Sequence, residues 1–177
     1  NDTPFVLDGE LFYLRRNFAH EVAVAGMLQS RLRQDDSAQD GNDIDLQGLF
    51  DENADAAQSG QVAAVRKALG HPIFVLTGGP GTGKTTVLKA IIEVYRILFP
   101  GNRIVLAAPT GKASRRMAQS TGMLEAMTLH SLLGLQGDFC SKDKRDKQLA
   151  VDFLIVDEAS MVDMWLAHQL FSRLQKG

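Results

Sequence analysis

The chain has 177 residues, of which 45% are hydrophobic, and a formal net charge of −2. These values are typical of one globular domain, and no stretch reaches the roughly 18 consecutive apolar residues of a membrane span. Residues 1–4 lack the basic start and apolar core of a signal peptide, and Cys140 is the only cysteine, so no internal disulfide can form. We therefore expect a cytoplasmic protein with no transmembrane role.

Charge is unevenly distributed along the chain. Residues 34–65 hold eight of the 21 acids and no lysine or arginine, which leaves 13 acids against all 19 bases in the remainder. The acidic, polar stretch over residues 34–59 is better explained as a solvated connection than as an acidic binding tail. The mildly basic remainder permits a nucleic-acid partner without requiring one.

The first sixty residues predict a hairpin, a helix and that connection. Two apolar runs flank a turn at Asp8-Gly9, which indicates a short β-hairpin over residues 5–14. Apolar residues then recur near helical spacing, so we expect an amphipathic helix over residues 17–33. A short helix over residues 61–69, stopped by Gly70-His71-Pro72, leads into a second unit, which we place at residues 61–177.

A phosphate-binding motif opens this second unit. Residues 78–85 read Gly-Gly-Pro-Gly-Thr-Gly-Lys-Thr and follow the apolar run 73–76, which we interpret as the strand that feeds the loop. Lys84 is expected to contact the β and γ phosphates and the Thr85 hydroxyl to bind Mg²⁺. A plain Gly-Pro turn would not require Gly-Lys-Thr at this offset. The predicted nucleotide contacts are Gly79, Pro80, Gly81, Thr82, Gly83, Lys84, Thr85 and Thr86.

The remaining pattern alternates helices with strands. After the loop, a largely buried helix is expected to end at Pro100-Gly101. Residues 104–108 and 153–156 are apolar without alternation, as in parallel strands that are covered on both faces. The sequence therefore predicts a doubly wound α/β domain, whose ligands bind beyond the carboxyl ends of the strands.

Two carboxylates follow the last of these strands. Asp157 is placed to bind the Mg²⁺ shell, and Glu158 can orient and deprotonate the attacking water. A small GTPase would need an Asn-Lys-x-Asp sequence, which is absent, and a nucleotide kinase would need an arginine-rich lid instead of adjacent carboxylates. Two classes of ATPase remain as interpretations of these motifs: a helicase-type motor and a ring-forming AAA+ ATPase.

A basic segment follows the strand at residues 104–108. Thr110 is a candidate N-cap, and Lys112, Arg115 and Arg116 lie in the first turns of the next helix. No acid occurs between Glu93 and Glu125, so this segment could meet phosphates, although a solvated basic face explains it equally well. Thr128 and His130 could likewise contact a nucleic-acid strand, but a lone histidine is more often structural.

Four segments together resemble one helicase family. They are residues 76–86 around the phosphate loop, 108–113 (Ala-Pro-Thr-Gly-Lys-Ala), 128–134 (Thr-Leu-His-Ser-Leu-Leu-Gly) and 155–161 (Ile-Val-Asp-Glu-Ala-Ser-Met). This set closely resembles superfamily 1 helicases of the RecD type, a family that includes the alpha subunits of bacterial exodeoxyribonuclease V. The Leu-x-Tyr-Leu-x-Arg pattern at residues 11–16 extends the resemblance to nearly the whole chain, and it is weakest over residues 34–59 and 136–150.

The resemblance implies a RecA-like fold and a role for each matching residue. Gln61 matches the glutamine that reads the adenine edge, with Gln58 as the fallback, and the carboxylates 157 and 158 match the metal-binding and catalytic acids. Lys84 and Thr85 match the phosphate and Mg²⁺ contacts of bound ATP. The implied contacts to single-stranded DNA are Pro109, Thr110, Gly111, Lys112, Thr128 and His130.

The resemblance also implies a larger assembly. Motors of this family move 5′ to 3′ on single-stranded DNA in a complex with RecB and RecC. A polar sensor strand and a second RecA-like lobe, which carries an arginine of the ATP site, follow in the family. We therefore expect the chain to be a truncated first motor lobe that barely hydrolyses ATP alone, since an arginine finger contributes about 10³ to 10⁵ in rate. A catalytically inert assembly module is the alternative for the chain by itself.

Overall fold

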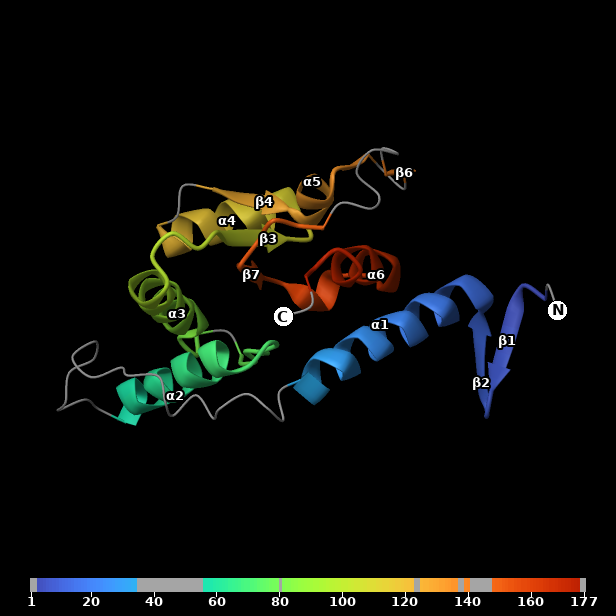
Figure 1. Ribbon diagram of the computed structural model, residues 1–177, viewed down its shortest axis with the longest axis horizontal. Helices are drawn as coiled ribbons and strands as arrows, with labels where there is room; N and C mark the ends of the chain where they lie inside the picture. The colour runs from blue at the N-terminus through green and yellow to red at the C-terminus, as the bar shows by residue number, and fades with distance from the viewer. Residues whose placement is uncertain are drawn as a thin grey trace.

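The computed structural model describes residues 3–34, 56–79, 81–122, 125–136, 139–140 and 148–175. At the N-terminus, β1 (Phe5–Asp8) and β2 (Leu11–Leu14) form an antiparallel hairpin that projects from one end of the long helix α1 (Arg15–Gln34) (Figure 1). Gly9, in the turn, has φ +59°, a conformation that glycine adopts without steric cost. The predicted hairpin and the helix after it are confirmed, and the helix begins two residues earlier than expected.

A three-stranded parallel sheet forms the centre of the second unit. β3 (Ile104–Ala108) lies between β4 (Ala126–Thr128) and β7 (Phe153–Val156). The two predicted strands, β3 and β7, are confirmed. β4 was not predicted, because three residues are too few for a period-2 pattern to stand out.

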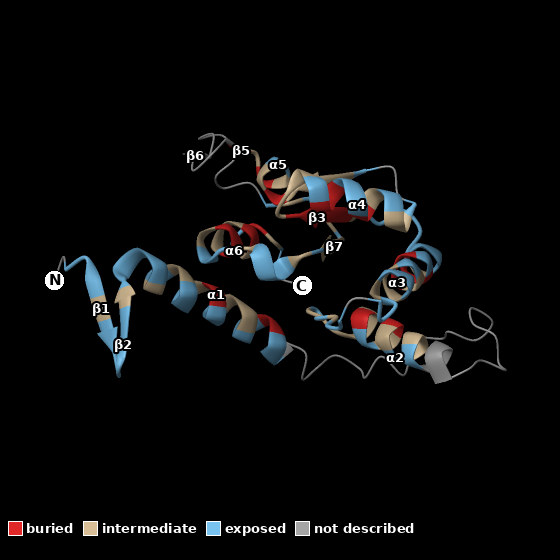
Figure 2. Ribbon diagram, turned by 180° about the vertical axis from the view of Figure 1, so that it is seen from behind, coloured by how far each residue is buried: buried red, intermediate tan, exposed pale blue. Residues whose placement is uncertain are grey.

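Helices cover both faces of this sheet. On one face, Leu106 packs with Ile92 of α3 (Lys84–Leu98) and Met117 of α4 (Gly111–Thr121). On the other face, Ala107 packs with leucines of α5 (Leu129–Leu133) and α6 (Met164–Phe171). Because successive strand residues point to opposite faces, β3 is buried on both sides, as Figure 2 shows. The prediction of an α/β domain with parallel strands covered on both faces is confirmed.

Helix α2 (Ala56–Gly70) packs against α3 next to the phosphate loop. Val65 and Ala68 of α2 and two aliphatic residues of α3 form a separate buried cluster, to which Phe74 adds its ring. The predicted strand over residues 73–76 is not formed, since this segment pairs with no strand in the described part of the chain and Val75 is 74% exposed. A short apolar run does not reveal by itself whether it will pair with a sheet or pack on helices, and here Phe74 packs on helices.

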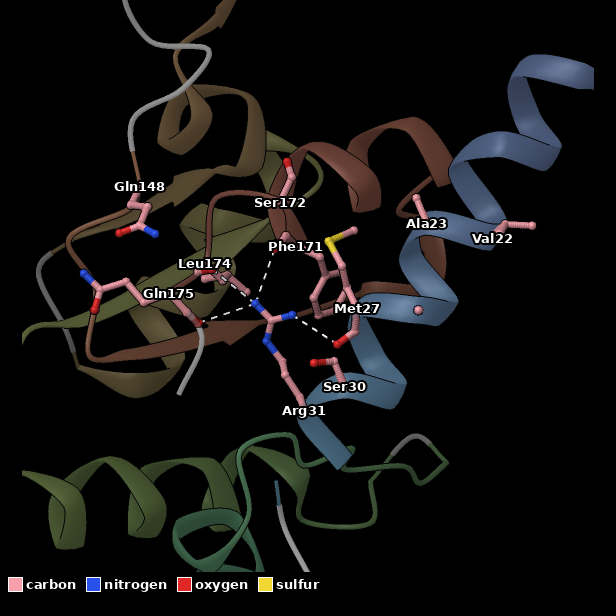
Figure 3. Close-up of a pocket in the computed structure, with 11 residues that line it drawn as sticks. Val22, Ala23, Met27, Ser30, Arg31, Gln148, Phe171, Ser172, Leu174 and Gln175 are labelled. Carbon is pink, nitrogen blue, oxygen red and sulfur yellow. Dashed lines mark hydrogen bonds between the residues drawn. The ribbon is translucent and has the colours of Figure 1, made fainter. Parts of the chain in front are cut away.

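Arg31 joins α1 to the end of α6. The residue is 7% exposed, and its guanidinium donates to the carbonyl oxygens of Phe171, Leu174 and Gln175 at 3.2 to 3.4 Å, and also to Met27 one turn earlier in α1 (Figure 3). Carbonyl groups at a helix C-terminus carry partial negative charge and lack partners within the helix, so a cation stabilises them. This contact holds the N-terminal hairpin and helix against the second unit.

Three further elements are short. β5 (Leu135–Gln136) pairs with β6 (Phe139–Cys140), so Cys140 belongs to a strand, and the 3₁₀ helix η4 (Ala159–Met161) precedes α6. The charged segment at residues 138–147 lies outside the described residues except for positions 139 and 140, as do residues 35–55 of the predicted acidic connection. No helix in the described ranges is long and apolar enough to cross a membrane.

Candidate nucleotide and nucleic-acid site

The loop between α2 and α3 has the backbone geometry of a phosphate cradle. Gly81 and Gly83 have φ values of +75° and +79°, which glycine adopts most readily. A Cβ at Gly78 would lie 2.6 Å from the Thr82 hydroxyl oxygen, so a larger residue here would displace that hydroxyl. Since α3 begins at Lys84 with no side-chain cap, its first N–H groups are available to an anion. Pro80 lies outside the described residues.

Lys84 organises this loop. Its Nζ donates to the carbonyl oxygens of Gly78 and Gly79, both at 2.6 Å, and the Thr82 hydroxyl donates to Gly79 at 2.9 Å. The ammonium is therefore held at the centre of the loop, where a phosphate would meet it. Thr85 and Thr86 are exposed in the first turn of α3, so both residues predicted to contact nucleotide or metal can be reached from solvent.

The two candidate adenine readers share one helix. Gln61 is half-buried on α2, and Gln58 lies three residues before it on the same helix. Residues three apart are neighbours along a helix, so the two positions lie within one turn of each other on α2. This geometry explains why spacing alone left the two glutamines as alternatives.

Strand register brings the other predicted segments to one edge of the sheet. Ala108 of β3 pairs with Thr128 of β4, and Ala107 of β3 pairs with Val156 of β7. Asp157 continues this pairing, because its backbone N–H donates to the Ala107 carbonyl at 3.0 Å. The segments that follow β3, β4 and β7 therefore lie side by side. These segments contain the predicted nucleic-acid contacts and the two carboxylates.

The backbone at the two carboxylates is unusual. Glu158 has φ +52°, and no other non-glycine residue in the described ranges has a positive φ. The Asp157 carboxylate accepts a hydrogen bond from the Glu158 backbone N–H at 2.9 Å, and the Glu158 carbonyl accepts one from Met161 in η4. The left-handed conformation costs a glutamate roughly 1–2 kcal/mol. Strain of this kind concentrates at functional sites.

Both predicted threonine contacts are helix N-caps. The Thr110 hydroxyl oxygen accepts from the Ala113 N–H at 3.2 Å and starts α4, and the Thr128 hydroxyl oxygen accepts from the Ser131 N–H at 3.1 Å and starts α5. The N-cap expected at Thr110 is confirmed. The cap at Thr128 was missed, although a threonine directly before an apolar helical run signals it. Each capping hydroxyl keeps its own hydrogen, which it can donate to a ligand.

The predicted residues thus fall into two groups. The first group lies at the sheet edge, where Pro109, Gly111 and His130 are half-buried, Lys112 is exposed, and both carboxylates are found. The second group is the phosphate loop, which is held by α2 and α3. Strand pairing was expected to bring the loop to that edge, and the strand over residues 73–76 that would do so is not formed. No predicted site residue lines the pocket of Figure 3, which lies between α1 and the segment after α6.

The oxygen donors that were predicted for Mg²⁺ suit this ion. Thr85 offers a hydroxyl and Asp157 a carboxylate, and both side chains are exposed. Among the described residues no group of three or more His, Cys, Asp or Glu side chains gathers.

Comparisons with known proteins identify the family of this chain. A family model described as an AAA domain matches residues 61–177. The RecBCD enzyme subunit RecD of Mycobacterium tuberculosis is 35% identical over 190 residues, covering 96% of this chain and 32% of the relative. The corresponding subunit of Buchnera aphidicola is 31% identical over 193 residues, covering 98% and 31%. The ATP-dependent RecD2 DNA helicase of Deinococcus radiodurans is 40% identical over 117 residues, covering 66% and 16%.

The chain spans about a third of the length of the RecD subunits that it matches. The similarity to them covers the N-terminal hairpin and helix as well as the α/β unit, because it extends over 96% or more of the chain. The phosphate loop, the parallel sheet and these matches support the same assignment. The chain therefore belongs to the AAA domain family, and over nearly its whole length it is similar to RecD-type DNA helicases.

Proposed function

We propose that this chain is the ATP-binding lobe of a DNA helicase subunit that couples ATP hydrolysis to 5′-to-3′ movement along single-stranded DNA in recombinational repair. The shared sheet edge is the observation that carries the proposal. Asp157 follows β7, the 109–112 turn follows β3 and Thr128 ends β4, and these three strands are neighbours. A shift at the hydrolysis carboxylates can therefore act directly on residues that hold the strand.

The nucleotide would bind to the second unit, residues 61–177, which follows the N-terminal unit at residues 1–60. Gln61 pairs with the adenine edge through its amide, which can donate and accept. Lys84 leaves the carbonyl oxygens of its own loop for the β and γ phosphates, while backbone N–H groups of the loop and of α3 bind phosphate oxygens. The loop contacts are Gly79, Pro80, Gly81, Thr82, Gly83, Thr85 and Thr86.

Hydrolysis needs a base and a metal ligand. Thr85 and Asp157 would hold Mg²⁺, and the ion would supply neutralisation of charge on the phosphates. Glu158 takes a proton from the attacking water, and its position one residue after the metal-binding carboxylate keeps these two roles adjacent. Its left-handed backbone, directly before η4, sets the direction in which the side chain leaves the main chain.

The strand would cross the edge formed by Pro109, Thr110, Gly111 and Lys112 and by Thr128 and His130. Contacts there are expected from hydroxyl groups, backbone N–H groups and one ammonium, which bind phosphates without reading the base sequence. The two capped helix starts fix the position of these donors. Because the RecD relatives are subunits of the RecBCD enzyme, we propose RecB and RecC as partners in the cytoplasm.

Glu158→Gln in the full-length protein tests the chemistry. This change keeps the size of the side chain but removes the base, so DNA-stimulated turnover should fall by about 10² to 10⁴ while ATP affinity is retained. Asp157→Asn should instead raise the Mg²⁺ concentration that supports half of the maximal turnover. Wild-type turnover in the Glu158 variant would contradict the mechanism. A wild-type protein that binds DNA and never hydrolyses ATP would instead indicate an inert assembly module.

A further inference from the structure

One exposed side of helix α4 carries three basic residues. Its exposed residues include Lys112, Arg115 and Arg116, which lie at positions i, i+3 and i+4 and are therefore neighbours on the helix surface. The α4 basic face, as we call these three residues, begins one residue after the start of the helix. It adjoins the sheet edge at which residues 109–112 follow β3.

Packing fixes the direction of this face. Ala113, Ser114 and Met117 are 4%, 4% and 1% exposed on the opposite side of α4, and Met117 packs against Leu106 of β3. The Thr110 cap holds the first turn, and the Ser114 hydroxyl donates to the Gly111 carbonyl at 3.1 Å. The helix cannot rotate without exposing its apolar side, so the three cations must remain in solvent.

The charge of this face is not neutralised within the described structure. None of its three cations makes a hydrogen bond or an ion pair there, and residues 94–124 contain no acid. The exposed face of α3 differs in composition, because Glu93 lies four residues after Lys89 and adds a negative charge there. Exposed cations without counter-charges attract phosphates and release the counterions of the nucleic acid.

We propose that the α4 basic face is a phosphate-binding track, on which the backbone of single-stranded DNA continues after it leaves the sheet edge. Lys112 links the two, since it belongs to both surfaces. From Lys112 to Arg116 the helix rises about 6 Å. No aromatic residue occurs in α4, so this track holds phosphates without stacking bases and binds all base sequences equally. The inference rests on the proposed function and adds Arg115 and Arg116 to the DNA contacts.

The test is the salt dependence of DNA binding in the full-length protein. Affinities for oligothymidylates of about 4 to about 16 nucleotides, the range of single-strand site sizes, are measured by fluorescence anisotropy at several salt concentrations. The variant Arg115→Gln/Arg116→Gln should lose affinity for the longer oligomers only. Its slope of log K against log salt should shrink by about 1.4, which corresponds to two phosphates on a single strand.

Matched variants complete the design. Lys89→Gln/Arg96→Gln removes two exposed cations from α3 and should leave both affinity and slope at the wild-type values. Arg115→Lys/Arg116→Lys keeps the charges and should restore the slope. A double glutamine variant with wild-type affinity and slope, while Lys112→Ala still weakens binding, would overturn the track and leave the proposed function standing. A wild-type protein that binds no oligomer would overturn both.

Discussion

The imidazole rings of His20 and His168 pack together with their centroids 4.8 Å apart and their planes tilted by 46°. His20 comes from α1 and His168 from α6, so the pair lies where the N-terminal helix packs against the lobe. Nδ1 of His168 is buried and has no hydrogen-bond partner among the described residues. Arg31 joins the same two helices further along α1. A proton on either imidazole would therefore place a charge in the contact that holds the two units together.

The first prediction concerns pH. Burial and the nearby His20 lower the pKa of His168 below its usual 6.5. The unfolded chain therefore binds a proton at a higher pH than the folded chain, so stability should be retained above about pH 6.5 and decline as the pH falls through that value toward the lower folded pKa. His168→Gln should flatten the decline in thermal melts between about pH 7 and pH 5. An unchanged slope would contradict this assignment.

Lys84→Ala should remove stabilisation by nucleotide. A ligand that binds only the folded state at 100 times its dissociation constant stabilises it by about 2.7 kcal/mol, which raises the melting temperature. With Mg²⁺ and ADP, the wild-type protein and the Lys89→Ala control should show this shift, because Lys89 lies one turn into α3 with its side chain exposed. Equal shifts in the Lys84 and Lys89 variants would show that the ammonium does not contact phosphates.

Gly78→Ala should disturb the phosphate loop. The added Cβ would lie 2.6 Å from the Thr82 hydroxyl oxygen, so the hydroxyl must move and lose its bond to Gly79. We expect weaker nucleotide binding in calorimetry. Gly60→Ala is the control, since nothing lies within 4 Å of its added Cβ and alanine stabilises a helix interior by roughly 0.5–1 kcal/mol. Undiminished affinity in Gly78→Ala would mean that the loop can adapt.

Gln61→Ala should remove base selectivity. The amide can pair with adenine but is mismatched to guanine, whereas phosphate contacts are common to ATP and GTP. The affinity for ATP should therefore fall more than the affinity for GTP, as measured by competition with a fluorescent nucleotide. Gln58→Ala serves as the comparison on the same helix. Lost selectivity in that variant alone would move the role to Gln58.

Much of the fold and site could be predicted from local patterns. The phosphate loop is recognised by residues within eight positions, and its glycines adopt the conformations that the motif requires at Gly81 and Gly83. The cap at Thr110 and the strand 104–108 are likewise local features. Such features depend on propensities and spacing that act between near neighbours, so the sequence displays them directly.

Pairing between distant segments was decided only in the tertiary structure. The sequence does not show that Ala108 lies beside Thr128, because β4 is three residues long and its register depends on which face of β3 it must bury. Residues 73–76 read as a strand, yet Phe74 packs on α2 and α3 and the segment does not join the sheet. The left-handed backbone of Glu158 and the contact between Arg31 and the carbonyl groups at the end of α6 depend on residues that are far apart in the sequence. Sequence alone therefore determined which chemical groups this protein carries, while competition between non-local contacts determined which of those groups meet.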